Sequence, residues 1–405
     1  MGAAMNRSSY FNTNIATLPR SSEEIALSTL TTSSWIEING QAIRNNITQF
    51  KQFIGQDKTL GIVIKSNAYG HGMLQVAQLC ENHPAVDYLL VAHVAEAVTL
   101  RQADITKKIL LVSAVRDNLG AAVYYECDIM VTDTDILEQL QAIGANLQKK
   151  INIHLKVDTG LSRFGFASEE IIPLLHLVKT MPNINVAGIY THFAESNSSD
   201  LTFTHQQENV FNALLTEIEL AGFVIPLRHY SNSAATTALS RERVNFFRLG
   251  AASYGIWPSE ENRTLITANN YSIALTPVLE WKTKIIHIKK IAAGSFVGYN
   301  RTYQTDKEMK IAIIPVGYYD GYDKRLSNKG VVLVNGHYAP VIGTVAMNAT
   351  TIDVTNIPNV QLDDIATLIG TNQEISPAEL AIQTGCLNAR QITTQINPTI
   401  SRVIL

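Results

Sequence analysis

The sequence predicts an α/β plus β architecture, in which an N-terminal (β/α)8 TIM-like barrel precedes a C-terminal antiparallel β domain. Between residues 60 and 250, eight short apolar runs alternate with amphipathic stretches, and this count matches the strands of a (β/α)8 barrel. After residue 270 the helical periodicity gives way to β-branched runs, which are typical of antiparallel β structure. A doubly wound sheet also supplies eight parallel strands, so the positions of the polar residues must distinguish the two.

Length and composition place the chain among globular proteins. Its 405 residues exceed what one compact core usually holds, which favours a large domain with a smaller one attached. Hydrophobic residues make up 46% and charged residues 17%, and the net charge is -3, so the chain is neither disordered nor suited to nucleic acid. Three cysteines lie far apart without a CxxC pair, so we expect buried thiols, no metal site and a reducing, cytoplasmic location.

We expect three segments along the chain. Residues 1–33 are rich in Ser and Thr, and we predict a flexible extension there without a signal peptide or membrane span. Residues 34–265 are predicted to form the barrel, except that 34–39 should be a strand joining the C-terminal domain. Residues 266–405 are predicted to form the β domain, where an Asn-Gly pair at 335–336 indicates a type I′ hairpin.

The elements of the barrel follow in order. Apolar residues at helical spacing predict a first helix over residues 43–54. The strand candidates are GIVIK, YLLVAH, KILLV, DIMV, INIHLKV, VAGIYTHF, LRHYSN and VNFFRLG. Apolar stripes predict helices between them, one with Ile136, Leu137, Leu140 and Ile143, and one with Phe203, Val210, Phe211, Leu214 and Ile218 that ends near Gly222.

Polar residues and a glycine follow these strands at their carboxyl ends. They are Lys65, Arg163, His192, Asn232, Ser233, Arg248 and Gly250. In a (β/α)8 barrel the carboxyl ends of all strands meet at the face where catalysis occurs. A doubly wound sheet would scatter these residues more widely, so their positions favour the barrel.

Lys65 is the candidate with the most informative chemistry. A buried lysine needs a carboxylate partner or a lowered pKa, and a neutral amine at a barrel mouth is suited to Schiff-base formation. Barrels commonly bind phosphate in the loops after strands seven and eight, where this chain has Ser233 at an expected helix start and Gly250. A Schiff-base lysine beside a phosphate site implies pyridoxal 5'-phosphate as the cofactor. The alternatives are a lysine that extends to the surface, and ordinary Ser and Gly residues at a cap and a turn.

The segment IVIKSNAYGHG, which carries Lys65, resembles the lysine segment of the alanine racemase family, the fold-type III pyridoxal phosphate-dependent amino-acid racemases. Six further segments resemble that family's motifs in the same order: KVDTGLSRFGF, YTHFA, SNSAA, RLGAASYG, VGYNRTY and VGYYDGY. The resemblance runs from about residue 34 to the C-terminus, and it implies a homodimer with active sites shared between subunits. It also implies interconversion of L-alanine and D-alanine, which would supply D-alanine for peptidoglycan.

Racemisation removes the α proton from one face of the substrate and replaces it on the other, so two groups on opposite faces are the simplest solution. By resemblance the catalytic residues are Lys65 and Tyr299 of the partner subunit. Arg163 is expected to help lower the pKa of the tyrosine. An arginine at position 248, opposite the ring nitrogen of the cofactor, keeps its own proton and so favours racemisation over transamination or decarboxylation.

The resemblance also assigns the binding residues. Those for the cofactor are Lys65, Tyr69, Arg163, His192, Asn232, Ser233, Arg248, Gly250 and Ala251. Those for the substrate are Arg163, Met347 and Tyr318, with Tyr322 expected beside Tyr318 at the entrance. His192 and His229 should link to Arg248. Lys156 matches a family lysine that can be carbamylated, and we expect a carbamate or a bound anion between it and Arg163.

Two residues depart from the family pattern. Asn348 stands where many members carry Asp, and Pro398 stands where a phosphate-binding tyrosine is expected. The resemblance leaves alanine, serine and broader amino-acid racemases open. A decarboxylase of the same architecture would release CO2, and a non-catalytic cofactor-binding barrel would lack a second base such as Tyr299.

Overall fold

The computed structural model describes residues 33–268, 273–386 and 388–405. Ser34–Leu405 form one compact unit. The prediction for residues 1–33 falls outside the described residues, except for Ser33. Within the described ranges, no helix is both long enough and apolar enough to cross a membrane.

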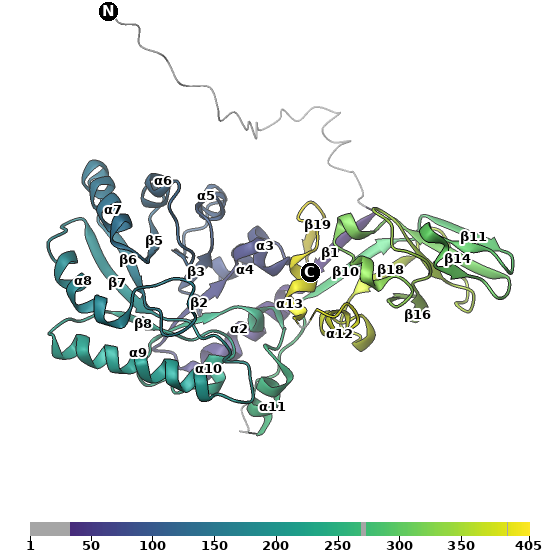
Figure 1. Ribbon diagram of the computed structural model, residues 1–405. Coiled ribbons are helices and arrows are strands. Elements are labelled where there is room, and N and C mark those ends of the chain that lie inside the picture. The colour runs from purple at the N-terminus through teal and green to yellow at the C-terminus, as the bar shows by residue number, and fades with distance from the viewer. Residues whose placement is uncertain (1–32, 269–272, 387) are drawn as a thin grey trace, which may run out of the picture. The chain divides into compact units, whose positions relative to one another are not determined.

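Eight parallel strands form a barrel with helices on its outside (Figure 1). They are β2 (Thr59–Val63), β3 (Tyr88–Val91), β4 (Lys108–Leu111), β5 (Cys127–Val131), β6 (Ile151–Lys156), β7 (Ile184–Tyr190), β8 (Leu227–His229) and β9 (Phe246–Leu249). Consecutive strands from β2 to β8 pair with one another, and β9 returns to pair with β2. Each of these strands overlaps one of the eight predicted apolar runs, so the (β/α)8 prediction is confirmed.

Hydrogen bonds outside the strand ladders join β8 to β9 and close the ring. Asn245 N donates to Arg228 O at 3.1 Å, and Arg228 N donates to Asn245 Oδ1 at 2.9 Å. Arg248 N donates to Ser231 O at 3.3 Å. The first two bonds join β8 to the residue before β9, and the third places the start of the loop after β8 beside β9.

The barrel helices are α2 (Gly40–Ile54), α4 (Met73–Glu81), α5 (Val94–Gln102), α6 (Leu119–Tyr124), α7 (Thr134–Leu147), α8 (Ile171–Val178), α9 (Thr202–Leu220), α10 (Ala235–Ala238) and α11 (Glu260–Ala268). Asn39 caps α2 and Asp133 caps α7, each accepting a backbone N–H with its side chain. The predicted stripe on α9 is partly wrong, because Phe203 and Val210 are exposed. Val210 lies next to Phe211 in sequence, about 100° round the helix, and so faces away from the core.

The C-terminal part is mostly antiparallel β structure, as predicted. Its strands are β10 (Leu279–Lys284), β11 (His287–Ile291), β12 (Phe296–Val297), β13 (Tyr303–Gln304), β14 (Met309–Ile314), β15 (Val331–Val334), β16 (His337–Pro340), β17 (Thr350–Asp353), β18 (Ile365–Ile369) and β19 (Ser401–Ile404). Two short helices, α12 (Pro377–Gln383) and α13 (Ala389–Thr394), precede β19. β15 and β16 form a hairpin with φ of 50° at Asn335 and 79° at Gly336, so the type I′ prediction is confirmed.

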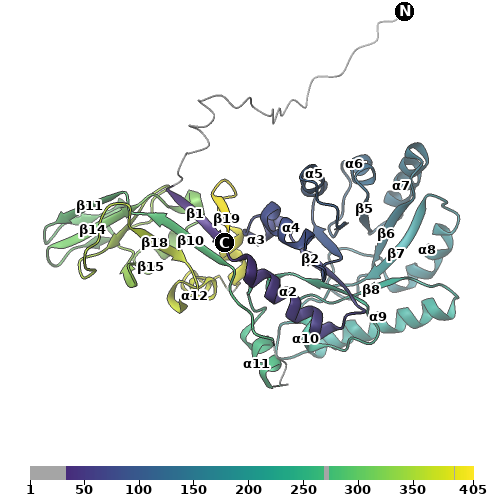
Figure 2. The ribbon, with the colours of Figure 1, turned by 180° about the vertical axis from the view of Figure 1, so that it is seen from behind.

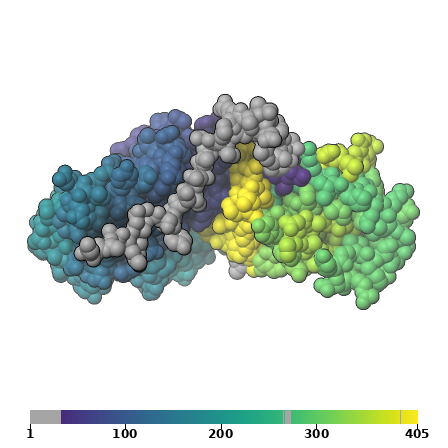
Figure 3. All heavy atoms as spheres, turned by 90° about the horizontal axis from the view of Figure 1, so that it is seen from above, coloured from purple at the N-terminus to yellow at the C-terminus, as the bar shows by residue number. Residues whose placement is uncertain are grey.

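The first described strand, β1 (Ser34–Ile38), belongs to the sheet of the C-terminal part. It pairs antiparallel with β10 and parallel with β19, within the sheet order β16-β15-β18-β10-β1-β19 (Figures 1 and 2). Figure 3 shows the C-terminal segment, in yellow, at the surface beside the purple N-terminal part of the described chain. The chain therefore enters the barrel from this sheet and ends in the same sheet.

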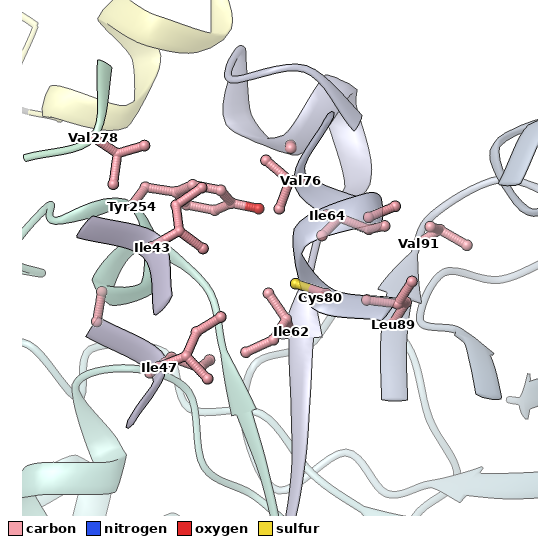
Figure 4. Close-up of a cluster of buried hydrophobic side chains, with 14 of the residues drawn as sticks. Ile43, Ile47, Ile62, Ile64, Val76, Cys80, Leu89, Val91, Tyr254 and Val278 are labelled. Carbon is pink, nitrogen blue, oxygen red and sulfur yellow. The ribbon is translucent and has the colours of Figure 1, made fainter. Parts of the chain in front are cut away.

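A buried apolar cluster holds the end of β2, just before Lys65. Ile43 of α2, Ile62 of β2 and Cys80 of α4 meet Leu89 of β3 and the ring of Tyr254, and all five are buried (Figure 4). Burying an aliphatic or aromatic side chain of this size contributes about 1.5–3 kcal/mol. All three cysteines of the chain are buried free thiols, as expected.

Candidate active site

One pocket collects the residues that the sequence places at the carboxyl ends of the strands. Its lining includes Lys65, Tyr69, Lys156, Arg163, His192, Asn232, Ser233, Arg248, Gly250 and Ala251. These residues come from the ends of β2, β6, β7, β8 and β9 and from the loops that follow. The barrel thus brings ten predicted site residues into one place, although they span nearly 190 positions of sequence.

The pocket is strongly basic. Five of its lining residues are basic, namely Lys65, Lys156, Arg163, Arg248 and Arg390, and none is Asp or Glu. None of the five forms an ion pair with a carboxylate in the part of the chain that the structure describes. Uncompensated positive charge in a cleft favours an anionic ligand, and the three arginines among these residues suit more than one anionic group.

Lys65 begins a left-handed turn and does not end the strand, which corrects the sequence interpretation. β2 stops at Val63, and residues 66, 67, 68 and 69 have φ between 52° and 55°. Four consecutive residues other than glycine in this region are rare, at a cost of about 1–2 kcal/mol each. This turn, labelled α3 (Lys65–Tyr69), therefore needs support from its surroundings.

Hydrogen bonds from distant segments provide that support. Glu96 of α5 accepts from Ser66 N at 2.7 Å, and Arg402 of β19 donates to Gly70 O with Nε at 3.2 Å and a terminal nitrogen at 3.1 Å. His71 donates from Nδ1 to Ala68 O at 2.9 Å, and burial lowers the pKa of His71 to about 4, so its ring is neutral. Neither Glu96 nor Arg402 was identified from the sequence, because each lies far from Lys65 along the chain.

The Lys65 amine lies in surroundings that favour its neutral form. Burial lowers its pKa most, and the nearby charges of Arg163 and Arg248 lower it further against the opposing effect of Glu96. A neutral amine is the form that attacks a carbonyl carbon. The structure thus gives Lys65 the electrostatic setting of a nucleophile.

Ser233 binds backbone N–H groups of the loop that follows β9. Asn232 Oδ1 accepts from Ala235 N at 2.9 Å at the start of α10, and this helix is too short to provide a useful dipole. Ser233 Oγ instead accepts from Gly250 N at 3.0 Å and from Ala252 N at 3.4 Å. Ser233 thus lies just before the start of α10, as expected, but the dipole of this short helix adds little, and the Ser233 hydroxyl contacts backbone N–H groups of the loop after β9.

Gly250 leaves space for a small cradle, which is formed by the Tyr69 and Ser233 hydroxyls and the backbone at Gly250. A Cβ atom at Gly250 would lie 2.9 Å from the hydroxyl oxygen of Tyr69, closer than real Cβ contacts. The Tyr69 hydroxyl therefore approaches this stretch of backbone, to which Ser233 Oγ also binds, only because position 250 has no side chain. Hydroxyl and backbone N–H donors around such a space suit a phosphate group.

Arg248 is held by a row of buried hydrogen bonds. Its terminal nitrogen NH1 lies 2.6 Å from His229 Nδ1, His229 Nε2 lies 2.9 Å from His154 Nδ1, and His154 Nε2 lies 3.4 Å from Asp128 Oδ2. Arginine only donates, so His229 Nδ1 accepts and its proton lies on Nε2. The same argument places the His154 proton on Nε2, where it is donated to the carboxylate. Each hydrogen bond in this row therefore has a defined donor and acceptor, and every donor lies on the Arg248 side of its acceptor.

The sequence interpretation named His229 but missed His154 and Asp128. Both interrupt apolar strands, in INIHLKV and CDIMV, which was the available signal. Gly188 makes room for the imidazole, because a Cβ there would lie 2.3 Å from His154 Nδ1. Burial and the charge of Arg248 keep the pKa of both His192 and His229 well below the usual value, so these rings are neutral. Burial lowers the pKa of Arg248 to about 10, so the guanidinium stays charged at neutral pH.

We expect Asp128→Asn to lower the stability of the protein. Asp128 also accepts from Tyr88 OH at 2.9 Å and from Asn152 Nδ2 at 3.0 Å, so three donors lose a charged partner. The loss should be about 1.5–3 kcal/mol in the free energy of unfolding, measured by urea denaturation. Asp117→Asn, on an exposed aspartate, is the matched control. If Asp128→Asn and Asp117→Asn had equal stability, this would contradict the assignment of the Asp128 carboxylate as the acceptor that ends the row of hydrogen bonds from Arg248.

Lys156 is buried beneath the pocket. Its Nζ donates to Val157 O at 2.9 Å and lies 5.3 Å from the ring centroid of Tyr190. Burial, followed by the charge of Arg248, lowers the pKa of Lys156 to about 7. Arg163 is exposed and lies against the ring of Phe164, 5.6 Å from its centroid.

Three predicted site residues lie outside this pocket. Tyr299, Tyr318 and Met347 are 71%, 42% and 54% exposed and belong to the C-terminal part. They lie on adjoining loops, since Thr344 Oγ1 donates to Tyr299 O and Tyr318 N donates to Ala346 O, each at 3.0 Å. Tyr322 is fully buried, so it does not line an entrance beside Tyr318.

Comparison with known proteins gives consistent matches along most of the chain. Family models described as the N-terminal and C-terminal domains of alanine racemase match residues 38–258 and 278–404. The curated alanine racemase of Methanococcus maripaludis is 35% identical over 375 residues, covering 92% of this chain and 98% of its own. The structure of alanine racemase from Clostridium difficile 630 superposes with a TM-score of 0.86 at 29% identity, covering 93% of this chain and 96% of that one.

A third match is more distant in sequence and shows the fold alone. The structure of alanine racemase from Bartonella henselae is 22% identical in sequence and superposes with a TM-score of 0.79. The match covers 93% of this chain and 100% of that one. That structure is described as holding covalently bound pyridoxal phosphate.

Proposed function

This chain belongs to the alanine racemase family, and from that premise we propose that it interconverts L-alanine and D-alanine, supplying D-alanine for peptidoglycan. The observation that carries the proposal is the pocket with five basic side chains, no acidic one, and Lys65 with a lowered pKa at its edge. Those charges suit an anionic cofactor together with the carboxylate of an amino acid. The buried free thiols suit a reducing compartment, so we place the activity in the cytoplasm.

Pyridoxal 5'-phosphate is the cofactor that these residues fit. The Lys65 amine would hold its aldehyde carbon, and the cradle of Tyr69, Ser233 and Gly250 would hold its phosphate. His192, Asn232, Ala251 and Arg163 would contact the rest of the group. When bound, the cofactor draws electrons from the α-carbon of an amino acid and so makes the α proton acidic.

Arg248 supports racemisation over the other reactions of such cofactors. Its guanidinium stays charged, is fixed by a hydrogen bond to His229 and does not release a proton at neutral pH. Opposite the ring nitrogen it would donate a hydrogen bond and leave that nitrogen unprotonated, which weakens electron withdrawal. Strong withdrawal is what transamination and decarboxylation need, so their rates should be low.

Lys65 and Tyr299 of the partner subunit would carry protons on opposite faces of the substrate. The Lys65 Nζ takes or returns the α proton on one face, and the Tyr299 hydroxyl does so on the other. Tyr318 and Met347 of the partner subunit would contact the substrate beside it. The exposure of these three residues on adjoining loops supports a homodimer in which each subunit completes the site of the other.

A panel of L-amino acids, each assayed for the D-product and for CO2, tests the proposal. L-Alanine should give D-alanine fastest, without release of CO2. Equal rates with serine or longer amino acids would indicate a broader racemase, and CO2 release would indicate a decarboxylase. Binding of the cofactor without any turnover would indicate a non-catalytic barrel.

Lys156 should carry a carbamate in this enzyme. A carbamate forms from a neutral amine and CO2, and an amine with a pKa of about 7 is largely neutral in a bicarbonate buffer above that pH. The negative group formed would lie between the positive charges of Arg163 and Arg248. Carbamylation should therefore appear as the pH rises through 7 and disappear below it.

The measurement is 13C NMR of protein equilibrated with 13C-bicarbonate. Wild type and the control Lys150→Gln, which changes an exposed lysine, should show one carbamate signal. Lys156→Gln should lose it. A signal that persists in Lys156→Gln, or no signal in wild type together with no anion at this place in a crystal structure, contradicts the expectation.

A further inference from the structure

Arg390 lines the pocket although it comes from the C-terminal part of the chain. It lies on α13 and shares the pocket with Tyr69, Ser233 and Gly250. A neighbouring hollow is lined by Arg390 together with Lys65, Ser66 and Tyr69. Arg390 therefore lies beside the cradle described above and shares both hollows with Tyr69.

Close packing fixes the position of α13 against the left-handed turn. A Cβ atom at Gly70 would lie 1.9 Å from Thr393 O, so the two backbones touch. Arg402 binds the same turn from β19, through its hydrogen bonds to Gly70 O. Arg390 is thus carried on a segment that is held to the turn containing Lys65 and Tyr69.

No carboxylate among the described residues forms an ion pair with Arg390. The Arg390 side chain donates from Nε to Asn388 Oδ1 at 2.9 Å. Burial raises the pKa of Tyr69, and the positive charge of Arg390 acts in the opposite direction. The charge of Arg390 is therefore felt at the Tyr69 phenol. A partly buried arginine without an acidic partner, beside hydroxyl and N–H donors, is suited to a phosphate, whose oxygens its planar fork matches.

Pro398 does not occupy this place. It is exposed, in the turn before β19, and it is absent from the pocket lining. The tyrosine expected at that position therefore has no counterpart there, and Arg390, eight residues earlier, is the residue of this segment that faces the cradle.

We propose that Arg390 binds the phosphate group of the cofactor, adding a charged ligand from the C-terminal segment to the cradle of Tyr69, Ser233 and Gly250. This inference rests on the proposed function, since it assigns one contact of its cofactor. If Arg390 binds the phosphate, the cofactor would join the Lys65–Tyr69 turn of the barrel to α13. Binding of the cofactor should therefore stabilise the contact between the barrel and the C-terminal segment.

The test compares two ligands that differ only in the phosphate. The apoprotein of wild type, Arg390→Gln, Arg390→Lys and the exposed control Arg44→Gln is titrated with pyridoxal 5'-phosphate and with pyridoxal, followed by protein fluorescence. Arg390→Gln should weaken pyridoxal 5'-phosphate about 10- to 100-fold and change pyridoxal less than about twofold, as expected for a lost charged hydrogen bond. Arg390→Lys should fall in between, because lysine keeps the charge and loses the fork.

A second readout needs no cofactor. Inorganic phosphate should raise the unfolding temperature of the apoprotein in wild type and Arg44→Gln, and less in Arg390→Gln. Unchanged binding of pyridoxal 5'-phosphate by Arg390→Gln overturns the inference, and so does an equal loss for both ligands, which would mark a structural role. The proposed function fails in a different way, when wild type itself binds no pyridoxal 5'-phosphate.

Discussion

Lys65→Ala should abolish racemisation and lower its rate at least about 10⁴-fold. The reason is that the Lys65 amine serves both as the covalent anchor of the cofactor and as the proton carrier on one face of the substrate. The assay is formation of D-alanine from L-alanine. The fold should persist, because the left-handed turn is held by Glu96, Arg402 and His71 and not by the Lys65 side chain. Lys329→Ala, at an exposed lysine, is the control and should keep full activity.

Chemical trapping tests the same residue without turnover. Borohydride treatment of the protein with pyridoxal 5'-phosphate should leave one stable adduct, at Lys65, by peptide mapping. Because burial and two arginines lower the pKa of Lys65, the adduct should form at a pH below that needed by ordinary lysines. An adduct at another lysine, or no adduct, would contradict the assignment of the anchor.

Tyr299→Phe should lower racemisation about 10²- to 10⁴-fold, the usual contribution of a general acid or base. Since Lys65 still serves one face, the variant should exchange the α proton of one enantiomer with solvent and lose exchange with the other. Deuterium exchange of L- and D-alanine by NMR measures this directly. Tyr124→Phe, which changes an exposed tyrosine of the barrel, is the control. Full activity of Tyr299→Phe in both directions would refute the opposite-face role.

Mixing the two inactive variants tests whether Tyr299 acts across subunits. A mixed dimer of Lys65→Ala and Tyr299→Phe chains has one site with both changes and one site with neither. Random mixing should therefore restore about a quarter of the wild-type activity. No recovery after mixing, in dimers shown to exchange subunits, would mean that Tyr299 serves its own chain or no site.

Much of this molecule follows from local patterns in the sequence. The eight apolar runs predict the eight strands because a strand with two buried faces needs continuous apolar residues. The Asn-Gly pair predicts the hairpin because both residues tolerate positive φ. Seven residues at or after strand ends predict most of the polar pocket lining because parallel strands in a barrel bring their carboxyl ends together, and the family resemblance adds Tyr69, Lys156 and Ala251.

The hydrogen-bond partners were decided only by the tertiary structure. The turn at Lys65 is left-handed because Glu96 and Arg402, 30 and 332 residues away from the groups they bind, can hold it there. The direction of the row from Arg248 to Asp128 depends on four strands, β9, β8, β6 and β5, placing their side chains in the same barrel interior. Arg390 enters the pocket because α13 packs on Gly70. Apolar periodicity is a property of neighbours along the chain, whereas a hydrogen bond between distant residues exists only once the fold has brought its two atoms within reach.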